Sequence, residues 1–235
     1  MQSYEVIIWG ASSAAIAKAI EYKNKGINTL LLNKFGFPGG DATEALNAFI
    51  NPSADLYDSI ISVAQNFAKG ILQSTENNML LHPESIKRAE WEIMLQHFVN
   101  YLFHVIPLQI KTNESQKFLE VYGREGKFEI EYKTLIDLSD DQYLLRTLNL
   151  EIKPITGITI CLFLNSQRTD FSLTNLNFET IIPTSVGVFV RLILPADSNV
   201  DIQFNNTLNS VIALLWEKYN IRPLLIPSRP VYNFN

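Results

Sequence analysis

The apolar positions at the start of the chain change period from strand to helix and back. Residues 4–9 form a short β-branched apolar run that ends at Gly10, and residues 12–25 carry apolar side chains at helical period, with Gly26 as a stop. Residues 28–32 are a second apolar run, which completes a unit of about 30 residues. Because near-continuous apolar strands belong in sheets covered on both faces, the pattern predicts a right-handed βαβ unit around a central parallel strand.

The middle of the chain predicts two further helices followed by a β-meander. Residues 55–69 and 84–103 are apolar at helical period, so each is expected to form a helix. Residues 104–111 predict a third strand, which Pro107 restricts to an edge or interrupted position in a sheet. Three period-two runs then predict a hairpin that leads into another strand, at residues 118–122, 128–132 and 134–138.

The pattern changes beyond about residue 149. Long β-rich runs at residues 158–165 and 186–194 are separated by a polar loop, and residues 206–219 predict a helix. The last segment, residues 221–235, contains three prolines and no helical period, which indicates a strand or an extended tail. The second half is therefore expected to be antiparallel and β-rich, so the chain is of the α/β class as a whole.

Composition and charge exclude several classes of protein. The chain has 235 residues, 47% of them hydrophobic, and its net charge of -5 argues against a nucleic-acid binder. Its single cysteine, Cys161, excludes an internal disulfide, and the three histidines offer no metal-ligand spacing. Glu5 stands where a signal peptide carries a basic residue, and no apolar run approaches the roughly 20 residues of a spanning helix. We expect a cytoplasmic protein with no metal and no membrane partner.

The turn after the first strand has the composition of a dinucleotide-binding site. Gly10 permits a tight turn, Ser12 replaces the second glycine of the usual pattern, and Ala15 replaces the third. The amino terminus of the following helix, which includes Ser13 and Ala14, would offer N–H groups and a positive dipole end to phosphate groups. The alternative is an ordinary strand-to-helix turn, which needs small residues for packing alone.

The end of the second strand carries Asn33 and Lys34. An adenosine-binding unit usually places an acid there, on the ribose hydroxyls. Asn33 can still form a hydrogen bond with a hydroxyl, but a neutral contact is weaker than a charged one. Lys34 could instead favour a 2′-phosphate, which keeps NADP open as a less favoured cofactor, and a plain surface turn is the third reading.

Residues 4–15 and 30–43 together resemble the amino terminus of FAD-dependent oxidoreductases of the glutathione-reductase-like superfamily. The spacing from Asn33 to Gly39 matches that family's spacing from its acid to a Gly-Gly pair. Residues 134–141 (TLIDLSDD) are similar to the family's strand end after the β-meander. The resemblance implies an FAD/NAD(P)-binding Rossmann-like three-layer domain at residues 1–148 and a smaller antiparallel β-rich domain at residues 149–235.

The resemblance also implies positions for a bound FAD. Gly10 and the turn from Ser12 to Ala15 would contact the pyrophosphate, and Asn33, beside Lys34, would contact the adenosine ribose. Asp137 would close the site from the other side. The ribityl chain or flavin would lie near Gly39, Gly40, Asp41, Ala42 and Thr43. The resemblance assigns no catalytic side chain.

Three departures from the family pattern leave two functions open. Asn33 replaces the ribose acid, Leu138 and Asp140 replace Ala and Gly, and the flavin-holding element of the family would fall beyond Asn235. One hypothesis is an FAD-dependent oxidoreductase of unknown substrate. The other is a non-catalytic relative that has lost FAD and acts as a binding or partner subunit, as a homo-oligomer or with another chain.

Other chemistries are less favoured by the sequence. A hydrolase nucleophile elbow at the Gly10 turn would need a larger sheet before its serine. Cys161, His97 and His104 are expected to be structural, and Trp9 is expected in the core rather than on an adenine. An open groove beside the Gly10 turn would favour flavin binding, whereas side chains that fill it, such as Phe35, Phe37 or Trp9, would favour the binding subunit.

Overall fold

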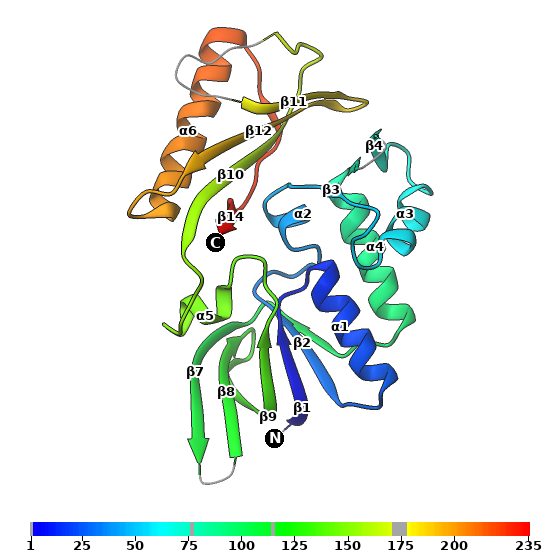
Figure 1. The fold of residues 1–235 in the computed structure, drawn as a ribbon, viewed down its shortest axis with the longest axis vertical. Helices are drawn as coiled ribbons and strands as arrows, with labels where there is room; N and C mark the ends of the chain where they lie inside the picture. The colour runs from blue at the N-terminus through cyan, green and yellow to red at the C-terminus, as the bar shows by residue number, and fades with distance from the viewer. Residues whose placement is uncertain (1, 76–77, 114–115, 171–177) are drawn as a thin grey trace.

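The computed structural model describes residues 2–75, 78–113, 116–170 and 178–235. Within these residues the strands form a six-stranded sheet in the order β6-β2-β1-β9-β8-β7, a five-stranded antiparallel sheet around β10, and a small sheet in the order β3-β5-β4. Figure 1 shows the six-stranded sheet at one end of the molecule and the antiparallel sheet at the other. Among the described residues, no helix has both the length and the apolar character needed to cross a bilayer.

The predicted βαβ unit is confirmed. Strand β1 (Gln2–Trp9) lies between β2 (Thr29–Asn33) and β9 (Gly126–Asp137) and is parallel to both. Helix α1 (Ser13–Asn24) connects β1 to β2. The end of β1 is fully buried, as expected for a strand covered on both faces. The carboxyl ends of β1, β2 and β9 therefore meet at one edge of the sheet.

The predictions for the third parallel strand and its neighbours were partly wrong. Helix α4 (Pro83–Gln96) is shorter than residues 84–103, because Phe98 takes a left-handed conformation with φ of 49° that ends the helix. The third parallel strand is β6 (Tyr101–Phe103), which pairs with β2. Residues 106–113 instead form β7, an antiparallel edge strand, as Pro107 indicated.

Other element bounds also differ from the predictions. Strand β8 (Gln116–Gly123) pairs with β9, and β9 is one continuous strand rather than the two predicted at residues 128–132 and 134–138. Helix α3 (Tyr57–Ala64) is shorter than residues 55–69. Helix α6 (Val200–Tyr219) begins earlier than residue 206 because the Asn199 side chain accepts a hydrogen bond from the backbone N–H of Ile202.

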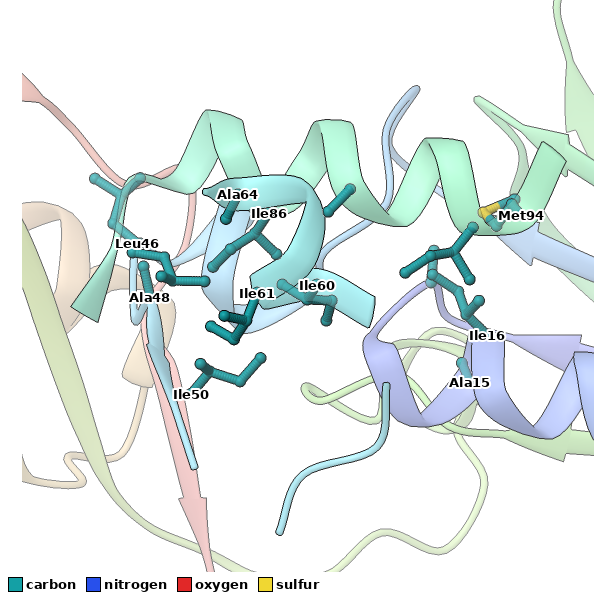
Figure 2. Close-up of a cluster of buried hydrophobic side chains, with 14 of the residues drawn as sticks. Ala15, Ile16, Leu46, Ala48, Ile50, Ile60, Ile61, Ala64, Ile86 and Met94 are labelled. Atoms are coloured by element: carbon teal, nitrogen blue, oxygen red, sulfur yellow. The ribbon is translucent and has the colours of Figure 1, made fainter. Parts of the chain in front are cut away.

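The predicted helices α1, α3 and α4 cover one face of the six-stranded sheet, together with a small sheet and a short helix that the sequence did not predict. The small sheet contains β3 (Phe49–Ile50), β4 (Ile71–Ser74) and β5 (Met79–Leu81). The short helix α2 (Asp41–Glu44) precedes it. Figure 2 shows where their apolar side chains meet: Ile60 from α3, Ile86 from α4 and Ile16 from α1 are all buried. This layer holds the amino terminus of α1 against the loop that precedes α2.

The second half is antiparallel, as predicted. Strand β10 (Ile155–Leu164) pairs with β12 (Gly187–Pro195), and the remaining strands are β11 (Phe178–Thr184), β13 (Pro223–Leu225) and β14 (Val231–Phe234). One face of β10 packs with α6 through residues such as Ile160, while Cys161 and Phe163 on the other face join the same buried cluster as Ile16. The two halves therefore share apolar packing. The predicted domain boundary between residues 148 and 149 falls after the short helix α5 (Tyr143–Thr147) and stays a prediction.

Candidate functional site

The Gly10 turn is tight because the end of β9 lies directly against it. Gly10 has φ of +113°, and a Cβ there would lie 2.6 Å from the backbone nitrogen of Ser139 and 2.8 Å from the carbonyl of Leu138. Ser12 precedes α1 without capping it, and its Oγ lies 3.4 Å from the Leu138 carbonyl oxygen, to which it donates. Glycine is required at this position by the protein's own backbone.

The loop before α2 packs onto this turn. The backbone N–H of Gly39 donates to the Ala11 carbonyl over 2.7 Å. A Cβ at Gly40, where φ is +51°, would lie 2.1 Å from Oδ2 of Asp140, and that same oxygen accepts a hydrogen bond from the backbone N–H of Asp41 over 2.7 Å. The structure therefore brings together the Gly10 turn, the Gly39–Thr43 segment and the end of β9, as the resemblance implied. Thr43 is turned inward, and its hydroxyl donates to the Pro38 carbonyl over 2.9 Å.

A cluster of buried and partly buried charged side chains fills the space between these segments. Arg229 donates from Nε to Glu44 and from Nη1 to Asp41, each over 2.6 Å. Lys34 donates from Nζ to Asp141 over 2.5 Å, and Asp141 also lies 3.8 Å from Nε of Arg229. We call this group the charge cluster, and its members are Lys34, Asp41, Glu44, Asp140, Asp141 and Arg229.

The charge cluster holds the carboxyl-terminal segment in place. The Arg229 side chain is 7% exposed and the Glu44 side chain 4% exposed, so the pair is almost fully removed from water. Ser228 adds two hydrogen bonds, from its backbone N–H and its hydroxyl, to the Glu44 carbonyl over 2.8 Å each. Figure 1 shows the carboxyl terminus between the antiparallel sheet and the elements around α2 and α5. The segment near residue 230 is thereby fixed beside α2.

Burial shapes the protonation of the four carboxylates in the charge cluster. It raises the pKa of Asp41 and of Glu44 despite the opposing charge of Arg229. Burial and the neighbouring charge of Asp41 raise the pKa of Asp140 to about 7. Burial also opposes ionisation of Asp141, but the charges of Arg229 and Lys34 outweigh it and lower that pKa. The pKa of Asp140 therefore lies near neutral pH.

Little space is left at the Gly10 turn. The cavity between Trp9, Asn33, Asp140 and Arg229 has a volume of about 10 Å³, which is enough for about one water molecule. Trp9 Nε1 is buried beside it, with no hydrogen-bond partner among the described residues. A larger cavity of about 410 Å³ lies on the other side of the turn, between the amino terminus of α1, the loop before α2 and residues 49–55.

The predicted ribose-binding residues are engaged within the protein. Asn33 is 3% exposed, and its Nδ2 donates to the Phe37 carbonyl over 2.9 Å. Lys34 lies between Asp141 and the ring of Tyr143, whose centroid is 4.0 Å from Nζ. Because both side chains already have buried partners, neither is free to contact a ribose hydroxyl or a 2′-phosphate in this arrangement.

Other residues singled out from the sequence have structural contacts. Asp137 accepts from the Ser139 hydroxyl over 2.5 Å and from the backbone N–H of Leu145 over 3.1 Å, so it caps the turn after β9. Trp9 lines the small cavity at the turn. Phe35 and Phe37 stack on each other at 5.4 Å between centroids and do not line that cavity. The charge cluster, rather than these aromatic rings, fills the space.

The sequence did not reveal Glu44, Asp141, Arg229 or Glu90 as site residues. Glu90 on α4 is fully buried, and its Oε1 accepts from the Ser13 hydroxyl over 2.6 Å. Burial raises the pKa of Glu90 to about 8, so this carboxyl is mostly protonated at neutral pH. The sequence signals that could have found these residues are weak: an acid inside an apolar helix face, and an isolated arginine between Ser228 and Pro230.

The small cavity between the Gly10 turn and the charge cluster does not fit the pyrophosphate of FAD. A pyrophosphate is anionic, and the charge cluster presents four carboxyl groups and two cations that are already paired. The cavity there holds about one water, and Asn33 is bound to its own loop. Among the residues that the structure describes, no group of three or more His, Cys, Asp or Glu side chains is arranged to hold a metal ion.

Comparisons with known proteins identify the family and the fold. A search of curated proteins finds no match. Among solved structures, CabE, an aromatic hydroxylase from angucycline biosynthesis, has a TM-score of 0.65 at 12% identity, over 95% of this chain and 51% of CabE. Aklavinone-11 hydroxylase, solved with FAD and aklavinone, has a TM-score of 0.61 at 13% identity, over 95% of this chain and 52% of the hydroxylase. A flavoprotein/dehydrogenase from Cytophaga hutchinsonii gives 0.61 at 15% identity, over 99% and 67% of the two chains.

These structural similarities show the fold: an FAD-binding Rossmann-like α/β unit with a separate antiparallel β-rich region. The chain spans about half the length of the two hydroxylases. The model of the FAD dependent oxidoreductase family matches residues 5–152, which is more than half of the chain. The protein therefore belongs to the FAD-dependent oxidoreductase family.

Proposed function

We propose that this protein is a family member that does not hold FAD at the Gly10 turn and that serves as a binding or partner subunit. The charge cluster is the observation that carries this proposal. Arg229 forms ion pairs of 2.6 Å with Asp41 and Glu44 beside the Gly10 turn, on which the resemblance places the cofactor's diphosphate. The fold of the family is then used for binding rather than for hydride chemistry.

The energetic cost of opening the charge cluster supports this proposal. Separating Arg229 from its carboxylates would break a buried ion pair, which typically costs about 3–5 kcal/mol. At 25 °C, about 1.4 kcal/mol corresponds to a tenfold change in affinity, so the cost weakens a ligand by roughly 10²- to 10⁴-fold. A ligand of micromolar intrinsic affinity would then bind only in the range of about 0.1–10 mM.

A specific observation favours a second candidate, an FAD-dependent oxidoreductase of unknown substrate. The cavity of about 410 Å³ opens beside Ser13 and Ala14, where the resemblance places the diphosphate, and along the loop from Gly39 to Ala42, where it places the ribityl chain or flavin. In this candidate, Arg229 leaves its partners when FAD enters. NADP is less supported, because Lys34 would have to leave Asp141 to contact a 2′-phosphate.

An absorption experiment distinguishes the two candidates. The purified protein is scanned over the flavin region, about 300–550 nm, before and during titration with FAD. The proposal expects no flavin bands after purification and no saturable shift below millimolar FAD. Co-purifying flavin, or saturation at micromolar FAD, would establish the oxidoreductase and overturn the proposal.

The variant Asn33→Glu adds a second test, because it restores the acid that the family pattern has at this position. In a weakened flavin binder the restored acid tightens FAD binding, whereas in a protein with a filled turn it leaves the titration unchanged. Asn66→Glu is the matched control, because it adds the same charge to an exposed residue near the end of α3, far from the Gly10 turn in sequence. A gain in FAD affinity for Asn33→Glu alone would count against the proposal.

A further inference from the structure

A second large cavity lies away from the charge cluster. It has a volume of about 480 Å³ and lies between residues 67–70, which follow α3, and the first turns of α4. This volume falls in the range of about 300–1,000 Å³ that is typical of small-molecule sites. None of its lining residues belongs to the charge cluster or to the Gly10 turn.

Two aromatic side chains line this cavity. Trp91 on α4 is held by an edge-to-face contact with Tyr101, at 5.1 Å between ring centroids, and by a tilted contact with Phe103 at 5.4 Å. Phe67 lines the cavity as well, and the Arg88 guanidinium lies 5.8 Å from its ring centroid. Fixed aromatic surfaces of this kind favour a flat, apolar ligand group, because stacking then costs little side-chain entropy.

Cations outnumber acids around the cavity, in a protein whose net charge is -5. Lys69, Lys87 and Arg88 line it, against the single acid Glu84. The Lys87 side chain is 25% exposed; its Nζ lies 2.6 Å from Glu84 and 4.4 Å from the ring centroid of Phe37. Arg88 is paired with Glu92, its Nε donating over 2.6 Å. The partly buried Lys87 therefore provides the charge-assisted hydrogen-bond donor for an anion, and Arg88 and Lys69 add positive charge nearby.

His82, which also lines the cavity, offers a further hydrogen-bond donor. Nδ1 of His82 accepts from the backbone N–H of Glu84 over 3.2 Å, so the neutral ring carries its proton on Nε2. Burial lowers the pKa of His82, which keeps the ring neutral at pH 7. The Ser85 hydroxyl lies 2.7 Å from the His82 carbonyl and 3.0 Å from the Gly70 carbonyl, which ties the two walls together.

We infer that this cavity binds a planar aromatic compound that carries a carboxylate or another anionic group. The aromatic ring contacts Trp91 and Phe67, and the anionic group contacts Lys87 with support from Lys69 and Arg88. This binding site goes beyond the proposed function and does not depend on whether FAD occupies the Gly10 turn.

The test uses naphthalene-2-carboxylate as the probe, titrated into the full chain by isothermal titration calorimetry. Naphthalene-2-carboxamide removes the charge of the probe, and cyclohexanecarboxylate removes its aromatic ring. We expect saturable binding of the carboxylate, and binding at least about fivefold weaker for each comparison compound. No saturable binding at about 10 mM probe, or equal binding of the carboxamide, would overturn the inference.

Variants locate the probe within the protein. Lys87→Gln should weaken binding at least about fivefold, and Glu84→Gln should strengthen it, because it removes the acid that competes for Lys87. Lys18→Gln is the matched control, since Lys18 forms an equivalent i,i+3 pair with Glu21 on α1. The Glu84 side chain is exposed and the Lys87 side chain is only partly buried, so these variants keep the core intact. Equal affinity in Lys87→Gln and Lys18→Gln would place the probe elsewhere and refute the proposed site.

Discussion

Replacing Arg229 with methionine tests the stabilising role of the charge cluster. Methionine keeps most of the aliphatic volume but leaves Asp41 and Glu44 buried without their nearest cation. Removing one partner of a buried ion pair typically costs about 3–5 kcal/mol. Protonating one of the carboxyl groups limits the loss, and this costs about 1.4 kcal/mol per pH unit above its ordinary pKa. We therefore expect Arg229→Met to lose about 3–4 kcal/mol of stability at pH 7, a large part of the 5–15 kcal/mol of a typical domain.

The pH dependence separates lost charge compensation from lost packing. Without Arg229, the folded-state pKa values of Asp41 and Glu44 rise further above their unfolded values, because burial already raises them. A carboxyl with a raised folded-state pKa is stabilised below its unfolded pKa and loses that stability as the pH rises. The deficit of Arg229→Met should therefore be larger at about pH 8 than at about pH 5.

Urea unfolding followed by far-ultraviolet circular dichroism at both pH values measures these deficits. Arg168→Met is the control, because Arg168 pairs with Asp170 at the surface, where ion pairs contribute little. A loss below about 1 kcal/mol in Arg229→Met, or an equal loss at both pH values, would show that Arg229 does not compensate buried carboxylates.

Two further predictions concern buried positions near the Gly10 turn. The pKa of Glu90 is raised to about 8, so its contribution to stability falls as the pH rises from about 4.5 toward 8. Glu90→Gln should therefore be up to about 3 kcal/mol more stable than the wild type at pH 7. At pH 4.5 it should not be more stable. Chemical denaturation at both pH values checks this, and a destabilised Glu90→Gln at pH 7 would contradict it. Gly40→Ala should lower stability by about 1–3 kcal/mol, because the added Cβ would clash with Asp140. Gly26 is the control: its φ is also positive, but no atom lies within 4 Å of an added Cβ, so Gly26→Ala should cost about 1 kcal/mol. Thermal unfolding compares the two, and equal losses would show that the contact at Gly40 is unimportant.

Hydrophobic periodicity correctly predicted those helices and strands that keep a single helical or strand period along their whole length. The βαβ unit at residues 4–32 and the strands at β10 and β12 were confirmed, because each is long and uniformly buried on its core face. Strand β6 was missed because it has three residues, and their apolar side chains continue the helical pattern of α4. The left-handed turn at Phe98, which separates the two elements, has no glycine or proline to signal it.

Only the part of the site that follows from local sequence and strand order could be predicted. The meeting of the Gly10 turn with the loop at Gly39 and Gly40 follows from the strand order of a βαβ unit. The charge cluster does not, because Arg229 and Glu44 are 185 residues apart, and an ion pair at that separation leaves no pattern in one sequence. The role of Arg229 becomes apparent only in the folded structure, where the carboxyl-terminal segment lies beside α2.

The glycines at the Gly10 turn do not discriminate between a cofactor site and a packed turn. At Gly10 a side chain would meet the backbone of Leu138, and at Gly40 it would meet Asp140, so both glycines are required by contacts within the protein. A bound pyrophosphate would need the same glycines for a different reason. What separates the two cases is the charge that surrounds the turn: a phosphate site presents unpaired donors, whereas here Arg229 and Lys34 are both paired with buried carboxylates. The surrounding acids, rather than the glycine motif, therefore support the proposal that this turn does not hold FAD.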